Sequence, residues 1–256
     1  MNYARAVVNA LVGDRVRVDR VETYVPGSLT IRISTVLGNR RIHRLMDPFL
    51  TPGAVVVDVG ANIGFNTVYA AQRVGSRGRV LAVEPADDNV AVLRTNVERS
   101  GLDNITVLPV AAGRQAETRR FFLRGEVSAV NSFYQDSVYA SVTDVVDVPV
   151  QTLDDLVDGE ADLVKIDVEG AELDVLGGMT RLLRSPRLRL VVEWHPLLQE
   201  KAGYAADELP RALLGAGFAL TAAAHTTTTA LTEQDISRSV DQLRRSGRPV
   251  DILAVR

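Results

Sequence analysis

Apolar residues in most of the chain form short continuous runs that alternate with stretches of helical period. Residues 54–59 make an almost unbroken apolar run whose single acid is Asp58. Such a run is typical of a strand that is buried on both faces of a sheet. Residues 87–100 instead repeat their apolar positions on one side and stop before Gly101, as an amphipathic helix with a glycine cap does. The pattern predicts strands and helices in alternation.

This alternation predicts the fold class. The expected strands are 54–59, 80–83, 105–110, 163–168, 188–194, 218–222 and 250–255, and the expected helices are 66–74, 87–100, one that carries Leu173, Leu176 and Leu183, and 207–214. Strands joined through helices form a parallel sheet, and crossovers of one hand place helices on both of its faces. We expect an α/β fold with a doubly wound, mainly parallel seven-stranded sheet. The last two strands lack a clear helix between them, so we expect an antiparallel last strand.

The first 48 residues follow a different pattern. Residues 3–11 have a helical period, and two β-like stretches, 21–25 and 29–36, flank the turn-forming residues Pro26-Gly27-Ser28. A chain of 256 residues is typical of one domain with modest additions. We therefore expect a helix and β-hairpin leader over 1–48, packed on a single domain over 49–256.

Composition narrows the partners. The chain is 46% hydrophobic and carries a net charge of −3, so it is typical of a soluble globular protein without general attraction to nucleic acid or anionic membranes. It has no cysteine, which excludes disulfides, thiolate catalysis and cysteine-bound zinc. Residues 1–12 are too short for a secretory signal, and no apolar run approaches the roughly 20 residues of a membrane span. Arginine outnumbers lysine and alanine is abundant, which is typical of a GC-rich bacterial genome. We expect a bacterial, cytoplasmic protein.

A glycine-rich turn follows the first buried strand. The segment Asp58-Val59-Gly60-Ala61-Asn62-Ile63-Gly64 stands between a strand and a helix, where open α/β sheets bind ligands. Gly60 and Gly64 allow a tight turn and a close approach to a ligand. Glu84 ends the next strand, and a carboxylate there can accept hydrogen bonds from both hydroxyls of a ribose.

The same turn argues against a dinucleotide. Asn62 stands where the G-x-G-x-x-G motif needs glycine, and the charge of Asp58 would repel a pyrophosphate but attract an ammonium group. The turn therefore suits a nucleoside with a cationic amino-acid tail. A NAD-dependent oxidoreductase and a noncatalytic nucleoside-binding protein are the alternatives from other classes.

Charged residues also end two later strands. Lys165, Asp167 and Glu169 share one face at strand period, and charges there are costly unless they are paired or face a cleft. One interpretation is a Lys165–Asp167 salt link with helix capping, and the other places Asp167 beside the reacting atoms. Glu193 and His195 would share a face on the next strand, where His195 suits the role of a proton acceptor near neutral pH. Asp167, Glu193 and His195 could also hold a divalent cation, but our favoured interpretation needs no metal.

Taken in order, these motifs resemble one known family. The segments are 58–64 (DVGANIG), Glu84-Pro85, 165–172 (KIDVEGAE) and 193–196 (EWHP), and they resemble the FkbM family of methyltransferases over roughly residues 50–256. The resemblance implies a Rossmann-like methyltransferase fold that uses S-adenosylmethionine, generally for O-methylation of natural products or glycans. On that resemblance, Asp58 and the turn over 60–64 hold the methionine part of the cofactor, Glu84 holds the ribose, and Val110 and Ala111 flank the adenine. The expected cofactor-binding residues are Asp58, Gly60, Ala61, Asn62, Gly64, Asn66, Glu84, Pro85, Val110, Ala111 and Asp167.

The reaction implied is a direct displacement that releases S-adenosylhomocysteine. We expect His195, oriented by Glu193 and assisted by Asp167, to take the proton from a hydroxyl of a small natural product or sugar. An N-methyltransferase acting on an amine of a small molecule is the alternative within the class. Residues 125–143 are either a wall of the acceptor site or an ordinary surface loop.

Overall fold

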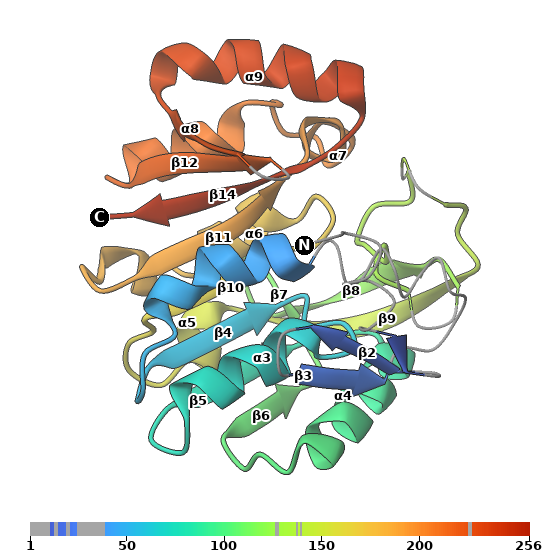
Figure 1. The fold of residues 1–256 in the computed structure, drawn as a ribbon. Helices are drawn as coiled ribbons and strands as arrows, with labels where there is room; N and C mark the ends of the chain where they lie inside the picture. Colours follow the sequence, from blue (N-terminus) through green and yellow to red (C-terminus); the bar gives the residue numbers. More distant parts are fainter. Residues whose placement is uncertain are drawn as a thin grey trace.

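The centre of the molecule is an eight-stranded sheet in the order β13-β12-β14-β11-β10-β4-β5-β6 (Figure 1). The computed structural model describes residues 11–12, 15–18, 21–24, 39–125, 128–136, 138, 140–224 and 227–256. The parallel strands are β4 (Val55–Val59), β5 (Arg79–Val83), β6 (Ile105–Leu108), β10 (Leu163–Ile166) and β11 (Arg189–Trp194), and the antiparallel ones are β12 (Ala219–Ala224), β13 (Thr227–Leu231) and β14 (Val250–Val255). The mainly parallel sheet with an antiparallel last strand is confirmed.

The eighth strand corrects the expected count of seven. Thr227–Leu231, where no strand was expected, pairs with β12 at the edge of the sheet. Threonine is β-branched and favours strands, and an edge strand needs no alternation of apolar residues. The helix α9 (Glu233–Ser246) then joins β13 to β14, where no helix was expected. It begins at a capping box of Thr232 and Asp235, which is a helix signal that sequence analysis overlooked.

The remaining helices are α3 (Phe65–Val74), α4 (Asp87–Ser100), α5 (Leu153–Leu156), α6 (Glu172–Gly177), α7 (Pro196–Lys201), α8 (Glu208–Gly215), the short helices η1 (Asp47–Phe49) and η2 (Leu182–Arg184), and the helical residues 39–46. The helices expected over 66–74, 87–100 and 207–214 are present as α3, α4 and α8, one expected helix is broken, and α5, α7, η1 and the helix over 39–46 were not expected. The helix expected to carry Leu173, Leu176 and Leu183 is two elements, α6 and η2. Gly178 caps the end of α6, and the chain there passes directly against Gly113. A Cβ on Gly178 would lie 1.9 Å from the carbonyl oxygen of Gly113. None of the helices described here is long and apolar enough to cross a membrane.

Both faces of the sheet are buried. Val57 and Val59 belong to a core with the later helices, while Val56 packs in a second core with α3 and residues 39–46. Successive side chains of a strand point to opposite faces, so both cores meet at β4. Asp58 lies on the same face as Val56, and its register partner on β10 is Lys165. The sheet therefore holds this buried charge pair beneath the helical residues 39–46.

Two smaller sheets complete the fold. One has the order β7-β9-β8, from β7 (Ala111–Ala112), β9 (Asp144–Gln151) and β8 (Glu117–Leu123). The other joins β1 (Leu11–Val12), β2 (Arg15–Val18) and β3 (Val21–Tyr24).

Of the expected leader, residues 3–10 and 29–36 lie outside the described part. Leu11, expected in a helix, is in a strand, and β3 pairs with β2. Tyr24 donates its N–H to Asn96 on α4 at 2.9 Å, which ties β3 to the main domain. The boundary at residue 48 stays a prediction.

Candidate active site

A cavity of about 340 Å³ lies at the carboxyl ends of the parallel strands. Open α/β sheets bind their ligands at this edge. The predicted site residues that line it are Gly60, Ala61, Asn62, Asn66, Glu84, Pro85, Ala111, Asp167 and Glu193. Asp58, Gly64, Val110 and His195 are not among its lining residues. The sheet therefore brings most of the predicted site to one cavity.

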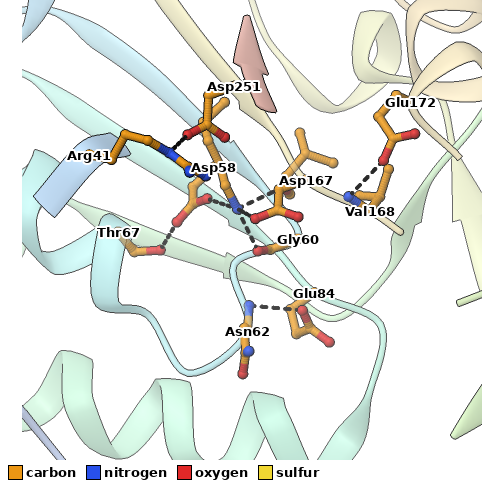
Figure 2. Close-up of polar contacts among 12 residues, drawn as sticks. Arg41, Asp58, Gly60, Asn62, Thr67, Glu84, Asp167, Val168, Glu172 and Asp251 are labelled. Carbon is orange, nitrogen blue, oxygen red and sulfur yellow. Dashed lines mark hydrogen bonds and ion pairs between the residues drawn. The ribbon is translucent and has the colours of Figure 1, made fainter. Parts of the chain in front are cut away.

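The turn after β4 is fixed to the end of β5. Gly60 and Ala61 donate their N–H groups to the carbonyl of Val83 at 3.0 and 3.1 Å, and Asn62 donates to Oε2 of Glu84 at 2.9 Å (Figure 2). Gly60 has a φ of 73°, and a Cβ there would lie 1.9 Å from the carbonyl oxygen of Asp167. Only glycine fits this position without displacing the segment after β10.

Glu84 presents a partly satisfied carboxylate to the cavity. It is 4% exposed, and its Oε1 accepts hydrogen bonds from Ala86 N and Asn89 Nδ2, both at 3.1 Å. Burial raises the pKa of Glu84 above its ordinary value, while these donors lower it. Oε2 accepts one protein N–H, and a carboxylate oxygen can accept a second hydrogen bond. That oxygen can receive a hydroxyl of a ligand.

Asp58 lies behind the cavity wall and neutralises a buried lysine. Its Oδ1 is 3.3 Å from Nζ of Lys165, and its Oδ2 accepts a hydrogen bond from Thr67 at 2.6 Å (Figure 2). Burial alone would lower the pKa of Lys165, but the charges of Asp58 and Asp167 outweigh burial and raise it. Lys165 also donates to the carbonyl of Gly60 at 2.9 Å, so the ammonium group supports the turn from beneath. The ammonium that Asp58 pairs with in the structure is thus that of Lys165.

Gly64 and Val110 support the cavity from outside its lining. A Cβ on Gly64 would lie 2.4 Å from Cδ1 of Leu93, so the glycine lets α4 pack against the turn. Val110 follows β6, which ends at Leu108, and packs against the main core. Both residues act on the cavity through packing in this structure.

Three carboxylates meet at one end of the cavity. Asp167 and Glu169 follow β10, Glu193 is on the neighbouring strand β11, and one oxygen from each lies within 4.8 Å of the other two. Burial, and next the charge of Asp167, raise the pKa of Glu169 and of Glu193 well above the ordinary value. Asp167 is also 3.6 Å from Nζ of Lys165, so the salt link considered from sequence is present. Glu172 accepts hydrogen bonds from the N–H groups of Val168 and Gly170, which holds the loop between these acids.

His195 is not brought to this cluster. Its side chain is buried, with 2% of the residue exposed, and burial lowers its pKa. Strand β11 ends at Trp194, and Pro196 opens α7, so the alternation of faces does not continue to His195. In the described structure the proton-accepting groups at the cavity are therefore carboxylates.

Other lining residues were not expected. Asn39 and Arg41 come from the helical residues 39–46, and Arg41 donates to Asp251 on β14 (Figure 2). Phe121 and Phe133 also line the cavity, and their rings meet edge to face with 5.3 Å between centroids. Asn89 also lines the cavity, and its position five residues after Glu84 was the one signal available from sequence.

The segment 125–143 supplies a wall of the cavity through Ser128, Ala129, Asn131 and Phe133. Arg124 is only 6% exposed, and its guanidinium holds this segment. The carbonyls that accept its side-chain hydrogen bonds are those of Phe122, Val130, Tyr134, Gln135 and Ala140. Asn89 donates to the carbonyl of Ser128 at 2.9 Å as well as to Glu84, so it joins this wall to the acid at the end of β5.

The fold and the position of the cavity are those of the S-adenosylmethionine-dependent methyltransferase class. A family model described as Methyltransferase FkbM domain matches residues 58–220, and the chain belongs to the FkbM family of methyltransferases. The hexuronic acid methyltransferase AglP of Haloferax volcanii is 31% identical over 170 residues, which are 64% of this chain and 65% of that protein. The chain thus matches slightly under two thirds of that relative's length.

Two solved structures have a similar fold. The methyltransferase FkbM of Methylobacillus flagellatus superposes with a TM-score of 0.50 and 17% identity, over 79% of this chain and 44% of that one. A putative rRNA methylase of Clostridium thermocellum gives a TM-score of 0.51 and 14% identity, over 86% of this chain and 96% of that one. At these identities the likeness concerns the fold.

Proposed function

We propose that the protein transfers the methyl group of S-adenosylmethionine to a hydroxyl of a sugar or another small natural product. The observation that carries the proposal is the pairing of the Gly60–Asn62 turn with Glu84 at a cavity of about 340 Å³. The turn suits the methionine part of the cofactor, and the free acceptor position on Glu84 Oε2 suits a ribose hydroxyl. The relative AglP is named for hexuronic acid, which supports a sugar-like acceptor.

The acidic end of the cavity supports the placement of the sulfonium. Asp167 follows β10 and lines the cavity beside Gly60, so a positively charged sulfonium near it would be stabilised. The acceptor oxygen would then attack the methyl carbon in line with the sulfur. The C–O bond forms, the C–S bond breaks, S-adenosylhomocysteine leaves and the hydroxyl proton passes to water. Alignment of the two reactants can lower such a barrier by roughly 7–11 kcal/mol.

The position of His195 changes the expected base. Because His195 does not line the cavity, we assign the orientation of the acceptor hydroxyl to Glu193 and Asp167, both of which do. We expect His195→Gln to retain methyl transfer if the protein folds, and Glu193→Gln to lower kcat. An unchanged kcat in Glu193→Gln would remove that residue from the proposal.

Cofactor binding is tested by titration calorimetry with S-adenosylhomocysteine and, separately, NAD. We expect binding of the first and none of the second. Glu84→Gln keeps the shape but removes the charge, and hydrogen bonds to charged groups contribute about 1.5–3 kcal/mol, so the Kd should rise roughly 10- to 100-fold. Glu98→Gln on the exposed side of α4 is the matched control and should bind like the wild type. No uptake of S-adenosylhomocysteine by ligand-free protein at millimolar concentration would overturn the proposal.

A further inference from the structure

The three carboxylates at the end of β10 and β11 have the geometry of shared ligands. One oxygen each from Asp167, Glu169 and Glu193 lies within 4.8 Å of the other two. Ca²⁺ binds oxygen at 2.3–2.6 Å, so two oxygens around one ion are separated by at most about 5 Å, and the corresponding limit for Mg²⁺ is about 4.2 Å. The spacing is therefore compatible with a single cation of the size of Ca²⁺ between the three groups, and a smaller ion such as Mg²⁺ fits when the oxygens are within its shorter limit.

The protein supplies little positive charge to this cluster. Lys165 lies 3.6 Å from Asp167, but it is closer to Asp58 and to the carbonyl of Gly60. Among the described residues, neither Glu169 nor Glu193 has a cationic side chain within 4.0 Å. Arg41, another cation at the cavity, pairs with Asp251. The three carboxylates are half-buried, and acids grouped in this way without a matching cation repel one another unless a bound ion compensates them.

Glu169 carries a second, independent sign of a ligand. Its Oε2 is closed to water and has no hydrogen-bond partner among the described residues, yet the carboxylate is directed into the cluster. Buried polar atoms in proteins nearly always have a partner, so an orphaned carboxylate oxygen indicates a group that the side chains do not provide. A divalent cation fits this position because carboxylate oxygens are its preferred ligands and it needs no hydrogen bond.

We propose that Asp167, Glu169 and Glu193 bind a divalent cation of the Mg²⁺, Mn²⁺ or Ca²⁺ type at the acceptor end of the cavity. The ligand set differs from the one considered from sequence, because Glu169 takes the place of His195. An all-oxygen set favours these hard cations over zinc or copper. The cation site rests on the three carboxylates alone, and its role in methyl transfer rests on the proposed function. In that role the ion would coordinate the acceptor oxygen, so that the hydroxyl loses its proton to water more easily as the C–O bond forms.

The site is tested with Mn²⁺ alone, added to full-length protein that has been freed of metal with a chelator. Electron paramagnetic resonance reports the free ion, whose signal falls when Mn²⁺ binds. We expect one Mn²⁺ per chain in the wild type and at least tenfold weaker binding in Glu169→Gln and Glu193→Gln. Asp241→Asn, an exposed acid on α9, is the matched control and should bind like the wild type. Competition with Mg²⁺ and Ca²⁺ then ranks the three ions.

The outcomes separate this proposal from the proposed function. The cation site is overturned if the free Mn²⁺ signal does not fall at millimolar Mn²⁺, whether or not S-adenosylhomocysteine is present. Unchanged binding of Mn²⁺ by Glu169→Gln overturns it as well. Glutamine keeps the shape of glutamate and relieves charge repulsion, and circular dichroism checks that both variants fold. Calorimetry with S-adenosylhomocysteine is read separately. If the protein binds S-adenosylhomocysteine but not Mn²⁺, the methyltransferase proposal stands and only the cation site fails. If the protein binds Mn²⁺ but not S-adenosylhomocysteine, the methyltransferase proposal is contradicted.

Discussion

Lys165 and Asp58 face each other across β10 and β4, with 3.3 Å between Nζ and Oδ1, and both side chains are buried. The same ammonium group holds the carbonyl of Gly60 at 2.9 Å. One buried pair therefore links the stability of the sheet to the shape of the glycine turn after β4.

We expect Lys165→Met to lower the free energy of unfolding by about 3–5 kcal/mol, because it leaves the charge of Asp58 buried without its partner. Adding Asp58→Asn should restore part of that loss. Urea denaturation of both single variants and the double variant measures the coupling. Lys201→Met removes an exposed lysine on α7 and should leave the unfolding curve nearly unchanged. Additive losses in the double variant would show that the two charges do not depend on each other.

Substitution of two glycines distinguishes the effect of steric crowding on stability from the effect of backbone strain. Gly53 and Gly60 both have positive φ, but a Cβ on Gly53 meets no atom within 4 Å, whereas one on Gly60 meets the carbonyl of Asp167. Gly53→Ala should cost about 1–2 kcal/mol of stability, from strain alone. Gly60→Ala should cost more and should also weaken binding of S-adenosylhomocysteine at least tenfold. Equal effects of the two substitutions on stability and binding would argue against the close approach.

Asn89 positions Glu84, the acid that we propose binds the ribose. Its Nδ2 donates to Oε1 of Glu84 and to the carbonyl of Ser128. We expect Asn89→Ala to raise the Kd for S-adenosylhomocysteine about tenfold, equivalent to about 1.4 kcal/mol, since the carboxylate loses a hydrogen bond that orients it. Calorimetry provides the measurement. Gln72→Ala, which removes an exposed amide from α3, serves as the control, and matching affinities in the two variants would exclude a role for Asn89.

His43 makes stability depend on pH. Its ring stacks on that of Tyr69 with 3.4 Å between centroids, and burial is the main cause that lowers its pKa from 6.5 to about 3. The unfolded chain takes up this proton near pH 6.5, whereas the folded protein does so only near pH 3. The contribution to stability is therefore complete above pH 6.5 and decreases as the pH falls, by about 2 kcal/mol at pH 5.

The substitution His43→Phe preserves a stacked ring but removes the titrating group. Chemical denaturation between pH 7 and pH 4 should show a steeper loss of stability in the wild type than in the variant. Other titrating groups are present in both proteins, so their contributions cancel when the two stability curves are subtracted. Parallel curves would mean that His43 keeps an ordinary pKa in the folded state.

The strand–turn–helix at residues 54–74 could be predicted from sequence because two strong local signals agree there. The apolar run of β4 indicates a strand that is buried on both faces, and Gly60 and Gly64 permit one tight turn. The position of the acids after β10 and on β11 could also be predicted, because the carboxyl ends of parallel strands lie at one edge of the sheet. The family resemblance predicted the identity of the cofactor, but it did not predict which side chains contact one another around the cavity.

The exact membership of the acidic cluster could not be predicted, because strand alternation stops where the strands stop. Glu169 has a φ of 53°, so its side chain is placed by a turn, next to Asp167 rather than two positions along an extended strand. His195 begins the approach to α7 and is buried in the interior. The helix α9 was missed for another reason. Its apolar face is narrow and its charges are many, so the capping box at Thr232 was a clearer signal than hydrophobic period.

The contacts of Arg124 determine which residues of the cavity wall can change among related proteins. Its guanidinium contacts the segment 125–143 through main-chain carbonyls, which every amino acid possesses. Substitutions at Ser128, Ala129 or Phe133 can therefore alter what the wall offers to a substrate while the backbone keeps its course. Related enzymes could exchange acceptors by replacing a few side chains on a retained frame.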